Sequence, residues 1–229
     1  MADGGKVPTP TLERLATYFA VITDLRNRRL DTISSTDIEE RTGINAAQFR
    51  KDLSYFGEFG RPGIGYKVDE LHTRLRRILK VERIQPVVLV GAGNLGSALV
   101  GYPPLREGNF HIMAVFDNNY NKIGKQLWDL SIHDISSLPE VNARINARIG
   151  IIAVPASAAQ EVAEKLIAAN VKTILNFAPT PLKLPPGVVA RHVDIVSELA
   201  VLSFHIPETE QDSGADDHGA AAVAASMTG

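Results

Sequence analysis

The sequence contains no cysteine, a single tryptophan and few aromatic residues, which make up 6% of its 229 positions. Without cysteine, disulfide bonds, thiolate metal sites and cysteine nucleophiles are all excluded. The six histidines are scattered singly, without the paired spacing of a metal-binding helix. We therefore expect neither thiol chemistry nor a metal site.

Long apolar runs and a leader-like amino terminus are also missing. The most apolar stretch, residues 87–101, is interrupted by three glycines and Asn94. The first residues lack the basic and apolar regions of a signal peptide. We therefore expect a cytoplasmic protein without membrane association.

Composition and charge are those of an ordinary globular protein, with 45% hydrophobic residues, 22% charged residues and a pI near 6.3. The length allows one large domain or two small ones. Residues 1–83 hold 15 Lys or Arg against 12 Asp or Glu, whereas residues 84–229 hold 9 against 14. The positive front section gives a first indication of a polyanionic partner for that part alone.

A glycine-rich turn at residues 91–96 is the most informative stretch. The apolar residues 87–90 predict a strand buried on both faces of a parallel sheet, and they lead directly into Gly91, Gly93 and Gly96. In such a turn the first glycine permits the tight bend, the second lets a pyrophosphate approach the backbone, and the third lets the next helix pack on the strand. The phosphates would bind the unpaired N–H groups of the helix that starts near Asn94.

The next predicted strand, 111–117, ends in Asp117, which lies 21 positions after Gly96. A carboxylate at this place accepts hydrogen bonds from the adenine ribose and repels a 2′-phosphate, which favours NAD(H) over NADP(H). A doubly wound domain with an unused turn is the alternative. The ordered series of strand, turn, helix, strand and acid favours nucleotide binding.

The front of the chain predicts three helices, each with its own start signal. These signals are Thr9 as N-cap with Pro10 after it, the capping-box spacing of Thr36 and Glu39, and Asn45 with Gln48 three residues on. The helices are expected to end near residues 26–29, at Gly43 and near Phe56. The second and third helices have the helix-turn-helix arrangement, whose second member can enter the DNA major groove.

The third helix and the segment after it predict a winged helix. One helix face carries Phe49, Leu53 and Phe56, and the opposite face carries Ala47, Arg50, Lys51 and Ser54. Four glycines within residues 57–66 then predict a tight hairpin with Arg61 near its tip. A small helical subdomain with ordinary solvated cations is the alternative, and the pattern alone does not decide between the two.

Beyond a basic helix expected at 68–80, strands and helices alternate, which predicts a Rossmann-type doubly wound parallel sheet. The expected strands are 87–90, 111–117, 148–154, 173–177 and 188–194, with an irregular segment and short helix at 128–141 and a helix at 157–169. Ligands of such sheets bind beyond the carboxyl ends of the strands. That edge would carry the Gly91 loop, Asp117, Val154, Pro155, Phe177 and Asp194.

The end of the chain predicts one more helix and a tail. The helix, from residue 195 to about 205, shows more apolar surface than a solvent-facing terminal helix should, so we expect it to dock on something. Residues 207–229 are acidic and then rich in alanine and glycine, which favours a disordered tail.

Four motifs taken together resemble the Rex family of redox-sensing transcriptional repressors: residues 50–57 (RKDLSYFG), 63–66 (GIGY), 91–96 (GAGNLG) and 174–179 (ILNFAP). The resemblance extends from about Val7 to Phe204. It implies a homodimer in which each chain has a winged-helix domain (1–83) and a Rossmann domain (84–206) whose last helix is swapped onto the partner. It also implies that operator DNA is bound when NADH is scarce and released when NADH binds, so that the repressor reads the ratio of NADH to NAD⁺.

The motifs and the sheet edge assign residues to two surfaces. DNA contact is expected from Gln48, Arg50, Lys51, Ser54, Tyr55, Arg61 and Tyr66. Cofactor contact is expected from Gly91, Ala92, Gly93, Asn94, Leu95, Gly96, Tyr102, Asp117, Val154, Pro155, Phe177 and Asp194. By the resemblance, Tyr102 and Asp194 lie near the nicotinamide and help to distinguish its two redox states. Without the resemblance, the sequence favours a packing role for Tyr102 against the following prolines and a helix N-cap role for Asp194.

Two positions depart from the family pattern. Some members carry in the first helix an arginine that pairs with the aspartate in one state, and Ala20 stands there in this chain. Arg14 lies six residues earlier on a different face, so this switch is either absent or supplied by another cation. In the wing, Arg61-Pro62 replaces an arginine placed immediately before glycine, which would shift its contact with DNA.

Two other classes of protein are weighed against a repressor. A small NAD-dependent oxidoreductase would need a second domain to hold substrate and an acid–base pair near the nicotinamide, and neither is indicated. We therefore assign no catalytic residue. A nucleotide-binding structural subunit whose front domain docks another protein is the second alternative.

Overall fold

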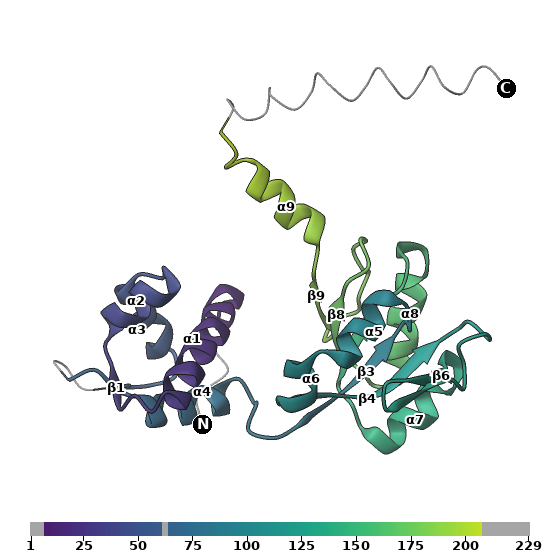
Figure 1. The fold of residues 1–229 in the computed structure, drawn as a ribbon, viewed down its shortest axis with the longest axis horizontal. Helices are drawn as coiled ribbons and strands as arrows, with labels where there is room; N and C mark the ends of the chain where they lie inside the picture. The colour runs from purple at the N-terminus through teal and green to yellow at the C-terminus, as the bar shows by residue number, and fades with distance from the viewer. Residues whose placement is uncertain (1–6, 61–63, 208–229) are drawn as a thin grey trace. The chain divides into compact units, whose positions relative to one another are not determined.

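The computed structural model describes residues 7–60 and 64–207. The chain divides into two compact units (Figure 1), one made of residues up to 85 with 107–111, the other of residues 86–106 and those from 112 onward. Each unit has its own apolar core.

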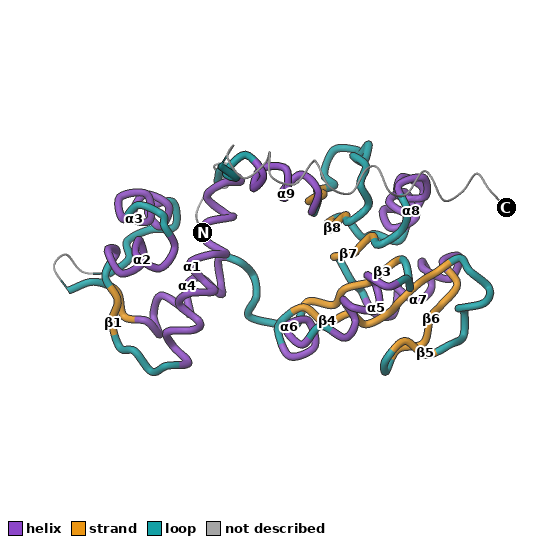
Figure 2. The backbone as a smooth tube through the Cα atoms, turned by 45° about the horizontal axis from the view of Figure 1, so that its top comes forward, coloured by secondary structure: helices purple, strands orange, loops and turns teal. Residues whose placement is uncertain are grey.

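The front unit consists of helices, labelled α1 to α4 in Figure 2, and a two-stranded sheet. Its elements are α1 (Thr9–Asn27), β1 (Thr32–Ile33), α2 (Ser35–Thr42), α3 (Ala46–Ser54), β2 (Tyr66–Lys67) and α4 (Val68–Ile78). The core is built from one face of each long helix, including Leu15 and Ile22 of α1, Phe49 of α3, and Leu71 and Leu75 of α4. The predicted apolar face of the third helix is thus confirmed.

Two of the predicted helix starts are displaced. The N-cap of α1 is Pro8, whose side chain accepts no hydrogen bond, and Thr9 is already helical. The capping box of α2 is formed by Ser34 and Asp37 rather than by Thr36 and Glu39. Both pairs have the same three-residue spacing, so the spacing alone cannot separate them.

The start of α3 agrees with the prediction in part. Asn45 is its N-cap and accepts a hydrogen bond from the Ala47 N–H at 2.8 Å. Glu39 of α2 adds a second acceptor, because its Oε2 lies 3.0 Å from the Ala46 nitrogen. Gln48 does not join this cap. Its side chain turns towards the interior of the unit.

The described part of the predicted wing includes strand β2, which follows the glycine-rich segment. Within the described residues, β2 pairs antiparallel with β1, through Thr32–Lys67 and Ile33–Tyr66. Because β1 has two residues, it is too short to show an alternating pattern in the sequence. Arg61, at the expected tip, lies outside the described residues.

A buried carboxylate fixes the third helix against the first. Asp52 of α3 is fully buried and accepts hydrogen bonds from Thr11, Arg14, Tyr18 and Gln48. Arg14 binds both oxygens, with Nε 2.6 Å from Oδ2 and Nη2 2.7 Å from Oδ1. Burial raises the pKa of Asp52, but these donors, Arg14 foremost, outweigh burial and hold the pKa below its usual value. Three of the four partners lie on α1, so the carboxylate sets how α3 is held.

The rear unit is a seven-stranded sheet with helices on both faces. Its elements are β3 (Gln85–Val90), α5 (Asn94–Gly101), α6 (Pro103–Glu107), β4 (Phe110–Asp117), β5 (Gln126–Leu127), β6 (Leu130–Asp134), the 3₁₀ turn Ile135–Ser137, α7 (Leu138–Ile145), β7 (Ile149–Ile152), α8 (Ala156–Ala168), β8 (Thr173–Asn176), β9 (Val189–His192) and α9 (Ile195–Ser203). The strand order is β5-β6-β4-β3-β7-β8-β9. Only β5, an edge strand, is antiparallel to its neighbour among the recorded pairings.

The two faces of the sheet have separate cores. Val88 and Phe116 point to the side covered by α7 and α8, where Leu166 packs. Val87 and Val115 point to the opposite side with α5. This is the doubly wound arrangement that the alternating elements predict.

Residues 128–141 are more regular than predicted. They include strand β6, which pairs in parallel with β4 through Val115 and Ile132. The sequence LSIHD of β6 is short and half polar, so it gives no continuous apolar run. After α5 ends at Gly101, the prolines at 103 and 104 begin the short helix α6. Among the described residues, no helix is long and apolar enough to cross a bilayer, and no cluster of acidic or histidine side chains is suited to a metal ion.

Replacing Asp52 by asparagine is expected to lower the free energy of unfolding of the front unit by about 2–3 kcal/mol, because hydrogen bonds to a charged group each contribute about 1.5–3 kcal/mol and Arg14 keeps some access to water. Urea denaturation at neutral pH measures this. The control is Glu40→Gln, at an exposed carboxylate of α2, which should change stability by less than about 0.5 kcal/mol.

Wild type and Asp52→Asn together also give a test of the pH dependence of stability. Since folding lowers the pKa of Asp52, its contribution is present above the unfolded pKa of about 3.9 and is lost as the pH falls through the folded pKa. The stability difference between wild type and Asp52→Asn should therefore shrink below about pH 4. A difference that grows on acidification would contradict this assignment.

Candidate functional site

The glycine turn between β3 and α5 has the geometry of a phosphate-binding loop. Gly91 has a φ of 109°, and a side chain there would overlap the Ala153 carbonyl group. A side chain at Gly96 would overlap the Gly91 carbonyl oxygen. At Gly93 a Cβ would meet nothing within 4 Å, so space above the backbone is open to a ligand. The amides at the start of α5 are free of helical partners, as in other anion-binding turns.

Asp117 closes the turn from the end of β4. Its side chain is 7% exposed, and Oδ2 accepts a hydrogen bond from the Ala92 N–H at 2.9 Å. Oδ1 accepts from the Asn119 N–H at 2.9 Å, and the Lys122 Nζ lies 3.0 Å from Oδ2. Burial raises the pKa of Asp117, but the two backbone donors and Lys122 outweigh it, so the pKa is below its usual value. The group is an anion that positions two loops.

A pocket of about 420 Å³ lies at this edge of the sheet. It is lined by residues from the ends of β3, β4 and β7 and from α8: Val90, Gly91, Gly93, Asp117, Asn118, Asn119, Lys122, Ile135, Ala153, Val154, Pro155, Ala158, Glu161, Val162 and Lys165. Chain order reverses between β3 and β7, and a doubly wound sheet binds ligands at such a reversal. Five of the predicted cofactor residues, Gly91, Gly93, Asp117, Val154 and Pro155, are brought together here.

The other predicted cofactor residues lie outside the lining of this pocket. Ala92, Asn94, Leu95 and Gly96 belong to the turn and the first turn of α5. Tyr102 is the C-cap of α5 with 52% of its surface exposed, and Phe177 follows β8. Asp194 is the N-cap of α9.

Asp194 caps α9 with both of its carboxylate oxygens. Its Oδ1 accepts hydrogen bonds from the Val196 and Ser197 N–H groups at 3.1 and 3.2 Å, and its Oδ2 accepts from the Ser197 hydroxyl at 2.6 Å. These bonds, that of the Ser197 hydroxyl first, lower the pKa of Asp194. The interpretation of this residue as a helix cap is confirmed.

On the front unit the predicted DNA residues differ in orientation. Arg50 and Lys51 are exposed, and one Arg50 nitrogen donates to the Ser35 hydroxyl of α2 at 2.7 Å. Ser54 is exposed but donates to the Lys51 carbonyl at 2.7 Å, and Tyr55 is exposed.

Two of the predicted DNA residues support the fold of the front unit instead of lying open. Gln48 donates to the buried carboxylate of Asp52 at 2.8 Å. The Tyr66 ring packs edge-on against Phe49 with centroids 5.2 Å apart, and burial raises its pKa. Of the predicted DNA residues on α3 and at its end, Arg50, Lys51, Ser54 and Tyr55 therefore face water.

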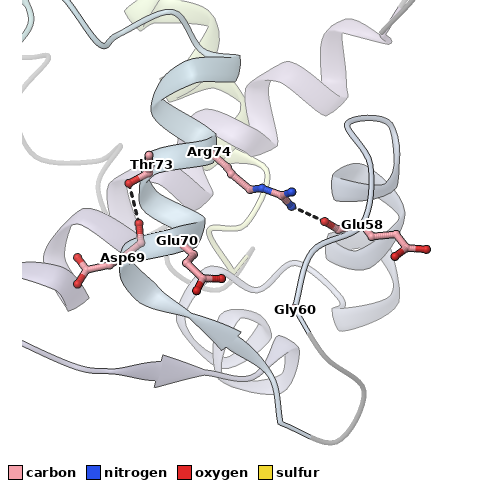
Figure 3. A pocket seen from close by; sticks show the side chains of 6 residues that line it. All are labelled: Glu58, Gly60, Asp69, Glu70, Thr73 and Arg74. Atoms are coloured by element: carbon pink, nitrogen blue, oxygen red, sulfur yellow. Dashed lines mark hydrogen bonds between the residues drawn. The ribbon is translucent and has the colours of Figure 1, made fainter. Parts of the chain in front are cut away.

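A second hollow, of about 670 Å³, lies between α4 and the segment after α3 (Figure 3). It is lined by Glu58, Gly60, Asp69, Glu70, Thr73 and Arg74. Arg74 donates to the Glu58 backbone carbonyl and stacks on Phe59, 4.5 Å from the ring centroid, whereas the Glu58 carboxylate points away. The lining still has two carboxylates, Asp69 and Glu70, against the one cation, which does not suit a phosphate. Arg74 holds the segment that leads into the wing.

Sequence reasoning missed two lysines that line the pocket and one buried carboxylate that holds α3. Lys122 and Lys165 line the pocket, and Lys122 pairs with Asp117. The burial of Asp52 was not predicted, because a charged residue that follows Lys51 is expected to face solvent. The five-residue spacing of Asp117 and Lys122 gives a weak signal at most, since it has meaning only once the chain turns after β4.

Comparison with known proteins extends these observations. A family model described as "CoA binding domain" matches residues 82–180, and one described as "Putative DNA-binding protein N-terminus" matches residues 6–54. Coenzyme A and NAD both contain an ADP pyrophosphate, which fits the glycine turn.

The chain is similar over most of its length to curated proteins named redox-sensing transcriptional repressor Rex. It is 48% identical to the Rex protein of Carboxydothermus hydrogenoformans, and the alignment covers 89% of this chain and 98% of the relative. It is 44% identical to that of Pelotomaculum thermopropionicum (91% and 98%), and 39% identical to that of Streptomyces coelicolor (96% and 85%).

Solved structures give the same result. The Rex-family repressor RSP in complex with NAD⁺ and operator DNA is 32% identical, with a TM-score of 0.82, covering 90% of this chain and 95% of the other. RSP in complex with NADH is 31% identical, with a TM-score of 0.79 and coverage of 90% and 97%. With both the sequence and the fold matched along nearly the whole length of these relatives, the chain belongs to the Rex family of redox-sensing transcriptional repressors.

Proposed function

We propose that this chain represses transcription as a homodimer that binds operator DNA through α3 and the wing, and that NADH at the β3–α5 turn releases it. The carrying observation is that one chain combines a glycine turn with open space at Gly93 and the buried carboxylate of Asp117 beside it with a helix-turn-helix that presents Arg50 and Lys51 to water. RSP, a relative with the same fold, is known in complex with NADH and in complex with NAD⁺ and operator DNA.

The cofactor assignment rests on the fit of the turn to a dinucleotide. The open space at Gly93 and the free amides of α5 suit the pyrophosphate, and the carboxylate of Asp117 suits the adenine ribose. When bound, the nicotinamide supplies the redox signal through its oxidised or reduced form. The chain contributes recognition only, and the curated relatives are named as repressors rather than as enzymes.

The nicotinamide end is assigned to Tyr102 and Asp194. Tyr102 is half exposed at the end of α5, the helix whose first turn receives the phosphates. Asp194 is a carboxylate at the start of α9, beyond the last strand of the sheet. Both side chains can respond to the charge that distinguishes NAD⁺ from NADH. NADH acts on DNA binding only through its preference for one conformation of the dimer.

The DNA surface is assigned to the exposed side chains of α3. Arg50 keeps free donors after its bond to Ser35, and guanidinium groups bind both guanine edges and phosphates. Lys51 suits a phosphate. The Asp52 cluster holds this helix rigidly, which favours a fixed docking geometry.

The homodimer rests on α9. No residue of this helix is buried, although many of its residues are apolar. Apolar side chains of the helix and its C-cap are between 58% and 85% exposed: Val196, Leu199, Val201, Leu202 and Phe204. A helix with this much apolar surface is not stable against water alone and needs a covering surface. A second copy of the chain, with α9 exchanged between the copies, supplies that cover. We place the dimer in the cytoplasm, where operator DNA and the NAD(H) pool meet.

Fluorescence anisotropy with operator DNA tests the proposal as a whole. Binding in the absence of cofactor that is lost on adding NADH, and largely kept with NAD⁺, supports it. Turnover of NADH without any DNA binding would instead indicate a small oxidoreductase, and unchanged DNA binding at saturating NADH would contradict the proposed release.

Arg50→Ala should weaken operator binding by about 5- to 150-fold while leaving NADH affinity unchanged, because a base-contacting arginine contributes about 1–3 kcal/mol. Lys51→Ala should reduce, by about one, the slope of the logarithm of operator affinity against the logarithm of salt concentration. Anisotropy at several salt concentrations measures both. Lys172→Ala, which removes an exposed cation of the rear unit, is the control. If it weakens binding as much as Arg50→Ala, the effect is one of net charge only.

Asp117→Asn should lower NADH affinity by about tenfold or more and narrow the preference for NADH over NADPH, because the charged acceptor of the ribose is lost. Lys122→Met should widen that preference, since it removes the cation beside Asp117 that would attract a 2′-phosphate. Calorimetric titration with both dinucleotides measures the two ratios. Equal losses of both dinucleotides in Asp117→Asn would indicate a purely structural role for this carboxylate.

Leu202→Asp should raise the dimer dissociation constant by at least about 30-fold, because a charge replaces an apolar side chain expected in the interface. Sedimentation equilibrium measures the association state. Glu198→Ala on the same helix is the control and should remain dimeric. A wild-type protein that sediments as a monomer at all concentrations would remove the proposed role of α9.

A further inference from the structure

The single tryptophan of the chain stands in a position that ordinarily favours glycine. Trp128 and Asp129 form the two-residue turn between β5 and β6, whose last pair is Leu127 with Leu130. Trp128 has a φ of 56°, in the left-handed region that bulky residues rarely adopt. A large side chain keeps such a backbone only where its surroundings hold it there, and such positions cluster at functional sites.

The indole is held by α5. Its Nε1 donates to the Ser97 carbonyl at 3.2 Å. The ring also lies against Gly101, the last residue of that helix, where a Cβ would overlap the indole. Glycine at this position therefore makes room for the tryptophan.

The same ring is held by α6. The Arg106 guanidinium lies over the indole, 5.5 Å from the ring centroid, and binds the Asp129 carboxylate at 3.0 Å. A cation–π contact and an ion pair thus tie the turn to α6. Although Trp128 is 61% exposed, it is fixed from two sides.

Between these two contacts lies Tyr102. It follows Gly101 directly, and its carbonyl accepts hydrogen bonds from the Leu105 and Arg106 N–H groups at 3.0 and 3.2 Å. Trp128 therefore contacts the residue before Tyr102 and the residue four positions after it. The indole thus contacts both helices that meet at Tyr102, which lies between α5 and α6.

We propose that Trp128 is a positioning residue that orients Tyr102 at the nicotinamide end and so contributes to the discrimination between NADH and NAD⁺. This inference rests on the proposed function, because it requires the dinucleotide on the β3–α5 turn. It adds to that function a specific part for the β5–β6 hairpin.

Calorimetric titration of the full chain with NADH and with NAD⁺ tests this in wild type, Trp128→Gly and Trp128→Phe. Glycine accepts the left-handed backbone and removes the ring, whereas phenylalanine restores part of the ring. Trp128→Gly should lower the ratio of NADH to NAD⁺ affinity by about 3- to 10-fold, the size expected for a residue that acts through another. Trp128→Phe should recover part of that ratio. Met113→Ala, at another exposed apolar side chain of the rear unit, should leave it unchanged.

A double variant separates positioning from mere stabilisation. If Trp128 acts through Tyr102, Trp128→Gly should lower the ratio little further in a Tyr102→Phe background, because the two changes affect one interaction. Equal losses of both affinities in Trp128→Gly, with the ratio intact, would overturn the proposal and leave only a packing role. A full additive effect on top of Tyr102→Phe would overturn it as well.

The outcomes also distinguish this inference from the function on which it rests. If wild type binds neither dinucleotide, the proposed function and the role of Trp128 both fail. If wild type binds both and Trp128→Gly keeps the wild-type ratio, only the role of Trp128 fails. Since Trp128 is the only tryptophan, energy transfer from its emission to bound NADH gives an independent reading of binding in wild type.

Discussion

The reversal of strand order between β3 and β7 is the constraint on which the rear unit depends. Along the chain, β4 and β6 lie on one side of β3, and β7 and β8 lie on the other side. In a doubly wound sheet the connections on the two sides of such a reversal leave in opposite directions, which opens a crevice at the carboxyl ends of the strands. The pocket with Gly91, Val154 and Pro155 lies there because the topology leaves it open.

Much of this architecture could be predicted from the sequence, because buried parallel strands are continuous apolar runs. Residues 87–90 and 111–117 have that signature, whereas β6 at 130–134 is half polar and was missed. Helix ends are harder to predict. The pairs Ser34–Asp37 and Thr36–Glu39 have equal spacing, and only tertiary packing, which recruits Glu39 to the start of α3, decides between them.

The site could be predicted where a backbone conformation demands a residue type, and not where a partner comes from a distant turn. Gly91 and Gly96 are dictated by steric limits that the sequence displays. The pairing of Lys122 with Asp117 depends on how the chain turns after β4. The sequence therefore predicts the carboxylate of Asp117 but not the cation beside it. Asp52 shows the converse case, a charge within a basic motif that faces inward.

The cap that Asp194 forms on α9 has one more consequence. Both oxygens of this carboxylate already accept hydrogen bonds, from Val196 and from Ser197. A carboxylate oxygen can accept more than one hydrogen bond, and the donor recorded at Oδ2 is the Ser197 hydroxyl, so a donor group of a ligand can join this cap without breaking it. A ligand bound there would then tighten the first turn of α9, and slower exchange of the Val196 amide hydrogen would report on it.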